Sequence, residues 1–113
     1  MINYDNRRFI AVSNTDNGET SSKTIFHYKQ ENNILTAHYA GGKIVCGHLL
    51  GLVDEQGHID IRYHQMNKED QLMTGRCQST PEVLPNGKIR LHEQWQWTSG
   101  DCSSGTSIIE EME

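Results

Sequence analysis

The chain has 113 residues, enough for one small domain, with 35% apolar side chains and a net charge of −5. Such a length can bury a single core, and the low mean hydropathy of −0.69 favours a β structure with one wet face over a densely packed helical domain. Because no run of Lys or Arg occurs, the composition argues against a nucleic-acid binder and against a membrane-surface protein.

Eight β-rich runs follow one another along the chain. They cover residues 7–12, 24–30, 34–40, 43–53, 58–66, 72–79, 88–97 and 106–111. The segments between most of them are short and rich in Gly and Asn, which supply the positive φ of tight hairpin turns. No window has helical periodicity. The two prolines, Pro81 and Pro85, fall in a connection where a strand edge or a wide turn is expected.

Eight consecutive antiparallel strands leave two exposed edges unless the sheet closes on itself. An up-and-down barrel removes both edges, and eight strands enclose room for side chains or one small ligand. We therefore predict an all-β fold, a single antiparallel barrel domain over residues 1–113 with short hairpins and little or no helix. Glycines inside the predicted strands (Gly47, Gly51 and Gly75) indicate a bend, a bulge or the close approach of another group.

The run KIRLHEQWQW places Glu93 on the same face as Trp95 and Trp97. If that face points inward, the matching inward positions on the other strands are Phe26, Tyr28, Leu35, Ala37, Tyr39, Ile59, Ile61, Tyr63, Gln65, Met73, Gly75 and Cys77. An apolar concavity with a few polar groups is typical of small-ligand pockets. The predicted ligand-binding residues are Tyr28, Tyr39, Tyr63, Gln65, Glu93, Trp95 and Trp97.

Glu93 has three interpretations. It is a buried carboxylate with a raised pKa that anchors a ligand or acts as a general base; it is a structural group that accepts hydrogen bonds from a tyrosine, a Trp indole or an arginine; or the whole face is exposed and the tryptophans lie in an interface. Since a buried carboxylate without a partner costs several kcal/mol, burial predicts a hydrogen-bond donor from a neighbouring strand.

The chain contains six histidines, at positions 27, 38, 48, 58, 64 and 92. Their spacing matches no zinc motif, although the turn at 40–42 can bring His38 beside His48. We expect an exposed histidine ladder on the outer face, no metal site and no cofactor. The three cysteines cannot all pair, so free thiols are expected, with Cys46 and Cys77 as small buried groups.

The stretch LMTGRC…NGKIRLHEQWQWTSGD resembles the avidin family, in which a Thr/Ser-Gly-x-Cys/Tyr strand and a turn precede a strand ending in Trp and TSG. The resemblance covers about thirty residues (72–101). It implies an eight-stranded barrel that holds biotin in its mouth, with Trp95 and Trp97 at ligand-stacking positions. The N-terminal Asn/Ser/Tyr set that binds the ureido group of biotin has no match, so biotin itself is not the expected ligand.

The whole chain also resembles a group of small uncharacterised bacterial proteins, some labelled automatically as N-acetylglutamate synthase. That activity is not expected, because the Gln/Arg-x-x-Gly-x-Gly/Ala loop that holds acetyl-CoA, and the helix after it, are missing. No apolar run spans a membrane, and the N-terminus lacks an apolar signal segment, so we expect a cytoplasmic protein.

The leading hypothesis is a protein that binds a small, partly apolar ligand inside the barrel, and a homo-oligomer is left open. The alternatives are an isomerase or cyclase with Glu93 as acid/base and a tyrosine as its partner, and a packed structural barrel without a ligand. A ligand binder or an enzyme predicts a water-filled cavity, and a packed barrel predicts none.

Overall fold

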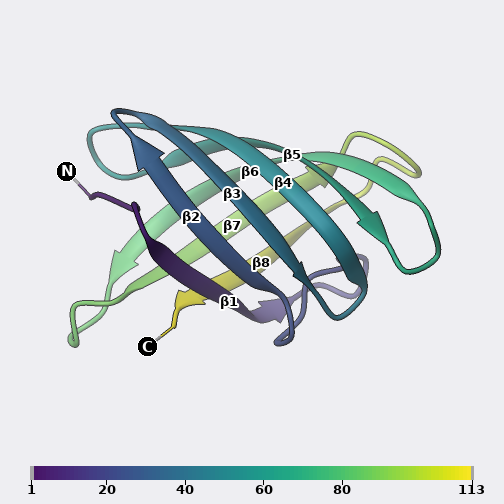
Figure 1. Ribbon diagram of the computed structural model, residues 1–113, viewed down its shortest axis with the longest axis horizontal. Coiled ribbons are helices and arrows are strands. Elements are labelled where there is room, and N and C mark those ends of the chain that lie inside the picture. Colours follow the sequence, from purple (N-terminus) through teal and green to yellow (C-terminus); the bar gives the residue numbers. More distant parts are fainter. Residues whose placement is uncertain (1, 113) are drawn as a thin grey trace.

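The computed structural model describes residues 2–112, so the two ends of the predicted domain, Met1 and Glu113, lie outside the described residues. Eight strands follow in chain order (Figure 1): β1 Arg7–Asn14, β2 Ile25–Glu31, β3 Ile34–Gly41, β4 Ile44–Val53, β5 Ile59–Asn67, β6 Leu72–Val83, β7 Ile89–Trp97 and β8 Ser104–Glu111. No helix occurs between residues 2 and 112. The predicted number and order of strands are confirmed.

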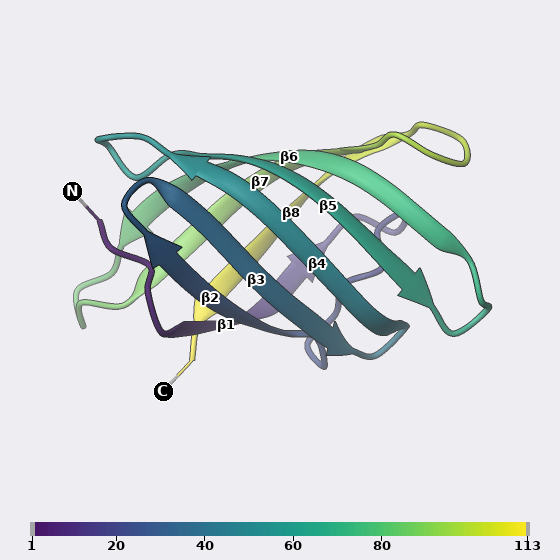
Figure 2. The ribbon, with the colours of Figure 1, turned by 45° about the horizontal axis from the view of Figure 1, so that its top comes forward.

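Each strand pairs antiparallel with the next, and β8 returns to pair with β1, so the sheet forms a closed barrel (Figures 1 and 2). The register between β1 and β8 shifts between Ala11 and Ser13, where a bulge accommodates the closing pair. Closure removes both sheet edges, as the sequence predicted. The two chain ends lie at one end of the barrel, and the β1–β2 and β7–β8 connections lie at the other.

Most turns between strands use Gly or Asn at a positive φ, as predicted: Asn32, Gly41, Gly42, Gly57, Gly87 and Gly100. Asp70 and Cys102 also have a positive φ, which was not predicted. Strand β6 is longer than predicted because it continues through Pro81, which pairs with Leu91 of β7. The pairing of β6 with β5 ends at Ser79, so Pro81 lies where β6 is an edge on that side and needs no donor there.

The inward face is the predicted one. Phe26, Leu35, Ile61 and Trp95 are all buried. On the same inward face Tyr63 and Glu93 are partly buried. The end of the barrel that holds the chain termini is closed by Tyr4, which is fully buried and whose hydroxyl donates to the carbonyl of Gly57 at 2.5 Å. This N-terminal plug was not predicted.

The strand glycines mark close approach rather than a bend. A Cβ atom built at Gly47 would lie 2.3 Å from the ring of Tyr39, and one at Gly75 would lie 2.2 Å from the ring of Tyr63. Each tyrosine lies across the strand beside it because the neighbouring residue has no side chain. Glycine therefore fixes how two rings line the barrel interior.

The three cysteines are unpaired, as predicted. Cys77 is buried, whereas Cys46 is exposed, so the prediction of a buried Cys46 is wrong. The register between β4 and β5 shifts between Ile44 and Cys46, and this bulge leaves both Val45 and Cys46 on the outer side. Among residues 2–112, no helix has the length and apolar character needed to cross a membrane.

Candidate functional site

A cavity lies inside the barrel at the end covered by the β1–β2 loop. Its free volume is about 50 Å³, room for a few water molecules. The lining residues come from the loop, from the strands and from the Trp face of β7; they are Asn14, Gly18, Glu19, Thr20, Phe26, Tyr39, Leu49, Ile61, Tyr63, Gln65, Cys77, Glu93, Trp95, Trp97 and Ser107. The barrel interior is thus not packed solid at this end.

Aromatic rings form much of the cavity wall. The ring centroids of Trp95 and Trp97 are 5.5 Å apart, and Tyr63 meets Trp97 edge to face at 5.9 Å. Phe26 and Tyr39 stack at 4.9 Å on another part of the wall. These packing geometries are favourable ones for aromatic pairs, so the rings stabilise one another as an apolar wall.

Glu93 is one of two carboxylates that line this cavity. Its Oε2 accepts a hydrogen bond from the Ser79 hydroxyl and its Oε1 accepts one from the Ser107 hydroxyl, both at 3.0 Å. The register explains this arrangement, because Glu93 pairs with Ser79 of β6 on one side and with Ser107 of β8 on the other. All three side chains therefore point to the same face of the sheet.

The predicted donor from a neighbouring strand is confirmed, although the donors are two serines and not a tyrosine, an indole or an arginine. The interpretation that placed the whole face in solvent is wrong, since Trp95 and Trp97 are buried. Burial raises the pKa of Glu93 above its ordinary value of 4.5, and the two serine hydrogen bonds oppose that rise.

A second polar group links the cavity to the loop above it. The Tyr39 hydroxyl donates to Gln65 Oε1 at 2.8 Å, and Gln65 Nε2 donates to Glu19 Oε1 at 2.8 Å. The other oxygen of Glu19 accepts from Asn67 Nδ2 at 2.7 Å. Because Gln65 is buried, the carboxylate of Glu19 supplies its amide nitrogen with an acceptor. The buried Asn67 also donates to Gln71 Oε1 at 2.8 Å.

The end of β1 and the β1–β2 loop are held over the mouth by bonds to β7 and β8. The Trp95 indole donates to Asn14 Oδ1 at 3.1 Å, and the Trp97 indole donates to the Asn17 carbonyl at 3.0 Å. Asn17 Nδ2 donates to the Ser104 carbonyl at 2.8 Å, at the start of β8. The polar β7–β8 connection therefore supports the loop, and none of residues 98–104 lines the cavity.

Six of the seven predicted ligand-binding residues line the cavity, namely Tyr39, Tyr63, Gln65, Glu93, Trp95 and Trp97. Tyr28 does not; it lies deeper, with its ring 4.7 Å from Phe9, and its buried hydroxyl has no partner among the described residues. The role of these residues in binding stays a prediction.

Sequence reasoning missed Asn14, Glu19, Ser79 and Ser107. Ser79 and Ser107 share the inward parity of Cys77 and Ile109, so a register aligned on the turns could have found them. The loop residues Asn14 and Glu19 carry no such periodic signal.

The cavity has an acidic character. Its lining contains two carboxylates, Glu19 and Glu93, and no Lys, Arg or His among the described residues. A ligand with a buried negative charge would meet no counter-charge there, whereas N–H donors would meet carboxylate and amide oxygens.

The comparisons with known proteins give one result. A family model described as avidin-like protein matches residues 2–112, nearly the whole chain. The comparisons with curated proteins and with solved structures return no match.

Proposed function

The chain belongs to the avidin-like protein family, and on that premise we propose that its barrel binds a small, partly apolar molecule in the cavity beside Glu93. The observation that carries the proposal is the position of Glu93: a partly buried carboxylate faces free volume instead of a packed core. A barrel selected only for stability gains nothing from a carboxylate at that place, because its desolvation is unfavourable.

The chemistry of the wall narrows the ligand class. Aromatic faces and two carboxylates favour a neutral or cationic molecule with N–H donors, which can pack on Trp95 and Trp97 and donate to Glu93. Cavities that bury drug-sized ligands usually measure roughly 300–1,000 Å³. The free volume of about 50 Å³ therefore admits only a very small molecule unless the loop moves.

Ligand entry in this proposal runs through the β1–β2 loop. Glu19 occupies the mouth and accepts hydrogen bonds from Gln65 and Asn67. A ligand with amide or amine groups can replace those contacts when it enters, so that the buried amides keep partners in the bound state. Because the ligand replaces Glu19 as the hydrogen-bond partner of the amides, the free-energy cost of moving the β1–β2 loop stays low.

An enzyme is the second candidate, supported by the raised pKa of Glu93. A carboxyl group with a raised pKa is a better general acid/base near neutral pH, and burial keeps the phenols of Tyr39 and Tyr63 protonated as donors. An isomerase or cyclase reaction uses such a pair. Catalysis that survives Glu93→Gln would contradict this second candidate, because glutamine cannot transfer the proton.

Native mass spectrometry of untagged protein purified from its own host tests the binding proposal. We expect a co-purifying small molecule on the wild type and on the control Gln94→Ala, whose side chain points outward on the same strand. Glu93→Gln should carry at least tenfold less. A protein that carries no small molecule, and whose Tm does not move with a panel of small neutral and cationic amines, contradicts the proposal.

Two finer features belong to the same proposal. The three free thiols support a reducing compartment such as the cytoplasm.

Exposed apolar side chains on the outer face of β3 and β4, including Ile34, Leu50 and Leu52, support association of the barrel with copies of itself. Light scattering coupled to size-exclusion chromatography measures that association, and a strictly monomeric protein at 100 µM, on the order of a weak dimer's Kd, contradicts it.

A further inference from the structure

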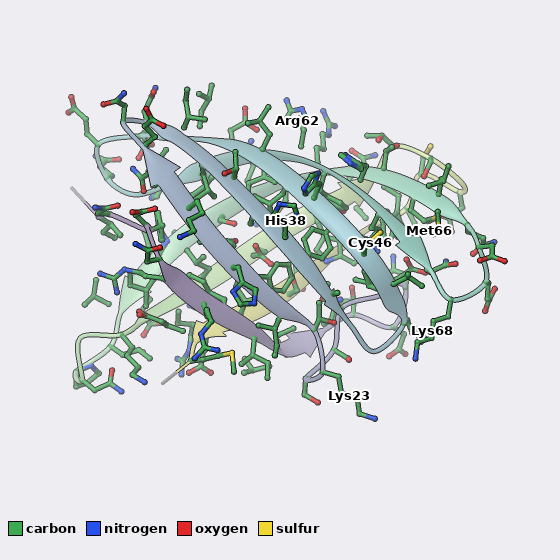
Figure 3. All side chains as sticks on the ribbon, in the orientation of Figure 1. Lys23, His38, Cys46, Arg62, Met66 and Lys68 are labelled. Carbon is green, nitrogen blue, oxygen red and sulfur yellow. The ribbon has the colours of Figure 1, made fainter. Side chains whose placement is uncertain are left out.

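Four histidines form a row across the outer face of the barrel. The register pairs His27 with His38, His38 with His48, and His48 with His64, so the row crosses β2, β3, β4 and β5 at right angles to the strands. All four side chains are exposed, and Figure 3 labels one of them, His38 on β3. The predicted histidine ladder is therefore present, with His38 beside His48 as expected.

The central pair of the row is in close contact. His48 Nε2 lies 2.9 Å from His38 Nδ1 and 3.1 Å from His38 Nε2, and the ring centroids are 4.0 Å apart. A metal ion with bonds of about 2.0–2.1 Å holds two ligands at a right angle about 3 Å apart. In the metal-free protein the two rings share a hydrogen bond, with one ring N–H donating to a nitrogen of the other. A bound ion would replace that shared proton between two nitrogens at a similar separation, and both rings would have to turn to direct their lone pairs at it.

A third imidazole lies on the far side of His48. The ring centroids of His48 and His64 are 5.5 Å apart, and His38, His48 and His64 line the same shallow depression on the outer face. Within residues 2–112 no three potential ligands are preassembled around one point, so His64 reaches a shared ion only by turning its ring. Its Cα is fixed opposite that of His48 by the strand register, which keeps it within reach.

The surroundings of the row are compatible with a cation. The nearest cationic side chain on this face of β5, Arg62, is paired with Asp60 at 2.7 Å, which offsets its charge. Cys46 and Met66 are paired in register two residues along β4 and β5 from His48 and His64, so the next pair on this face carries sulfur. Imidazole and sulfur donors select late transition metals over Mg²⁺ and Ca²⁺.

We propose that His38 and His48, with His64 as third ligand, bind a late first-row divalent ion on the outside of the barrel, with water completing its coordination. The expected order of affinity is Cu²⁺ above Ni²⁺ and Zn²⁺, with no binding of Mg²⁺. This site is separate from the cavity, and its existence does not depend on any ligand inside the barrel. The sequence alone did not predict it, because the spacing in the chain matches no metal motif.

Isothermal titration calorimetry of the untagged protein with CuCl₂, NiCl₂, ZnCl₂ and MgCl₂ tests the proposal. We expect one Cu²⁺ per chain. His48→Ala should weaken Cu²⁺ binding by more than roughly tenfold. Loss of a residue that only supports a metal ligand already costs about that much affinity, and loss of a ligand should cost more. His64→Ala should weaken it less. His58→Ala is the matched control, since His58 is an exposed histidine in the β4–β5 turn, away from the row, and it should bind as the wild type does.

Two results would overturn the metal site. One is a His48→Ala variant that binds Cu²⁺ as tightly as the wild type; the other is equal weakening in His58→Ala, which shows that any surface histidine suffices. The Cu²⁺ electron paramagnetic resonance spectrum gives an independent readout, because two or three imidazole ligands produce nitrogen hyperfine splitting that His48→Ala must reduce. The Tm of each metal-free variant, matched to the wild type, excludes misfolding as the cause.

Discussion

Trp97 and Asn17 are 80 positions apart in the chain, yet the indole N–H of Trp97 donates to the Asn17 carbonyl at 3.0 Å. This bond joins the wall of the cavity to the loop that covers its mouth. The neighbouring Trp95 makes a parallel bond to Asn14 at the end of β1. An opening of the mouth must break bonds to side chains that also form the apolar wall, so loop position and wall geometry are coupled.

The first prediction concerns that bond. Trp97→Phe keeps an aromatic ring in the wall but removes the N–H donor, and one hydrogen bond contributes about 1 kcal/mol. The amides of residues 15–20 should exchange with deuterium about fivefold faster, measured by hydrogen–deuterium exchange. Gln94→Ala on the outer side of β7 should leave exchange unchanged. Unchanged loop exchange in Trp97→Phe would show that the bond does not hold the loop.

The second prediction concerns the carboxylate in the mouth. Glu19→Ala removes the acceptor of Gln65 Nε2, whereas Asn67 Nδ2 keeps its bond to Gln71. Leaving the buried Gln65 amide without a partner costs about 1–3 kcal/mol when water does not replace Glu19. We expect a lower free energy of unfolding in urea and stronger quenching of tryptophan fluorescence by acrylamide. Glu19→Gln, which keeps one acceptor oxygen, should lose less. A Glu19→Ala variant that is as stable as the wild type, with tryptophans as well shielded from acrylamide, would show that Glu19 does not hold the mouth closed.

The third prediction is a pH dependence set by Glu93. Because burial raises the pKa of this group in the folded state, the folded protein holds more protons than the unfolded chain between the ordinary value of 4.5 and the raised value. The contribution of Glu93 to stability therefore falls as pH rises through that window and stays low above it. A tenfold difference in acid dissociation constant between the folded and unfolded states corresponds to about 1.4 kcal/mol.

Glu93→Gln lacks this titration, and its amide can still meet the two serine hydroxyls. The variant should be more stable than the wild type at pH 7, with the difference vanishing below pH 4, in urea denaturation at a series of pH values. Glu31→Gln, at the exposed end of β2, serves as the control for removal of an acidic charge. A stability difference that does not change with pH would rule out a raised pKa at Glu93.

The fourth prediction concerns the glycine beneath Tyr39. A methyl group at Gly47 would lie 2.3 Å from the Tyr39 ring, whose hydroxyl is fixed by Gln65, so Gly47→Ala must displace the ring. Such overpacking costs about 1–3 kcal/mol in free energy of unfolding. In the double variant Gly47→Ala, Tyr39→Leu, the leucine leaves room for the new methyl group and should remove part of that cost. A double-mutant cycle of unfolding free energies measures this coupling. Full additivity of the two changes contradicts the contact.

Much of the barrel could be predicted because its signals are local. Alternation of apolar and polar residues, interrupted by turns rich in Gly and Asn, determines both the strands and their inward faces. Trp95 and Glu93 therefore fall on the correct side of the sheet. Cys46 does not, because a bulge changes which residues face outward without leaving a mark in the pattern.

The parts of the site that could not be predicted depend on contacts between distant segments. Glu19 and Asn17 lie in a polar loop without periodicity, and their positions follow from partners on β5, β7 and β8. The close contact of His38 with His48 required the exact cross-strand register as well as rotamers that the sequence does not specify.

The wall between the outer histidine row and the inner cavity is a single sheet one residue thick. His38 and Tyr39 are adjacent in β3, and His64 lies between Tyr63 and Gln65 in β5, so consecutive residues face opposite sides. An ion that clamps the outer row restrains the backbone that carries the cavity side chains. If such an ion changes the affinity of the barrel for the inner ligand by some factor, thermodynamic linkage requires that the ligand change the affinity for the ion by the same factor. The two proposed sites therefore share the backbone of β3 and β5.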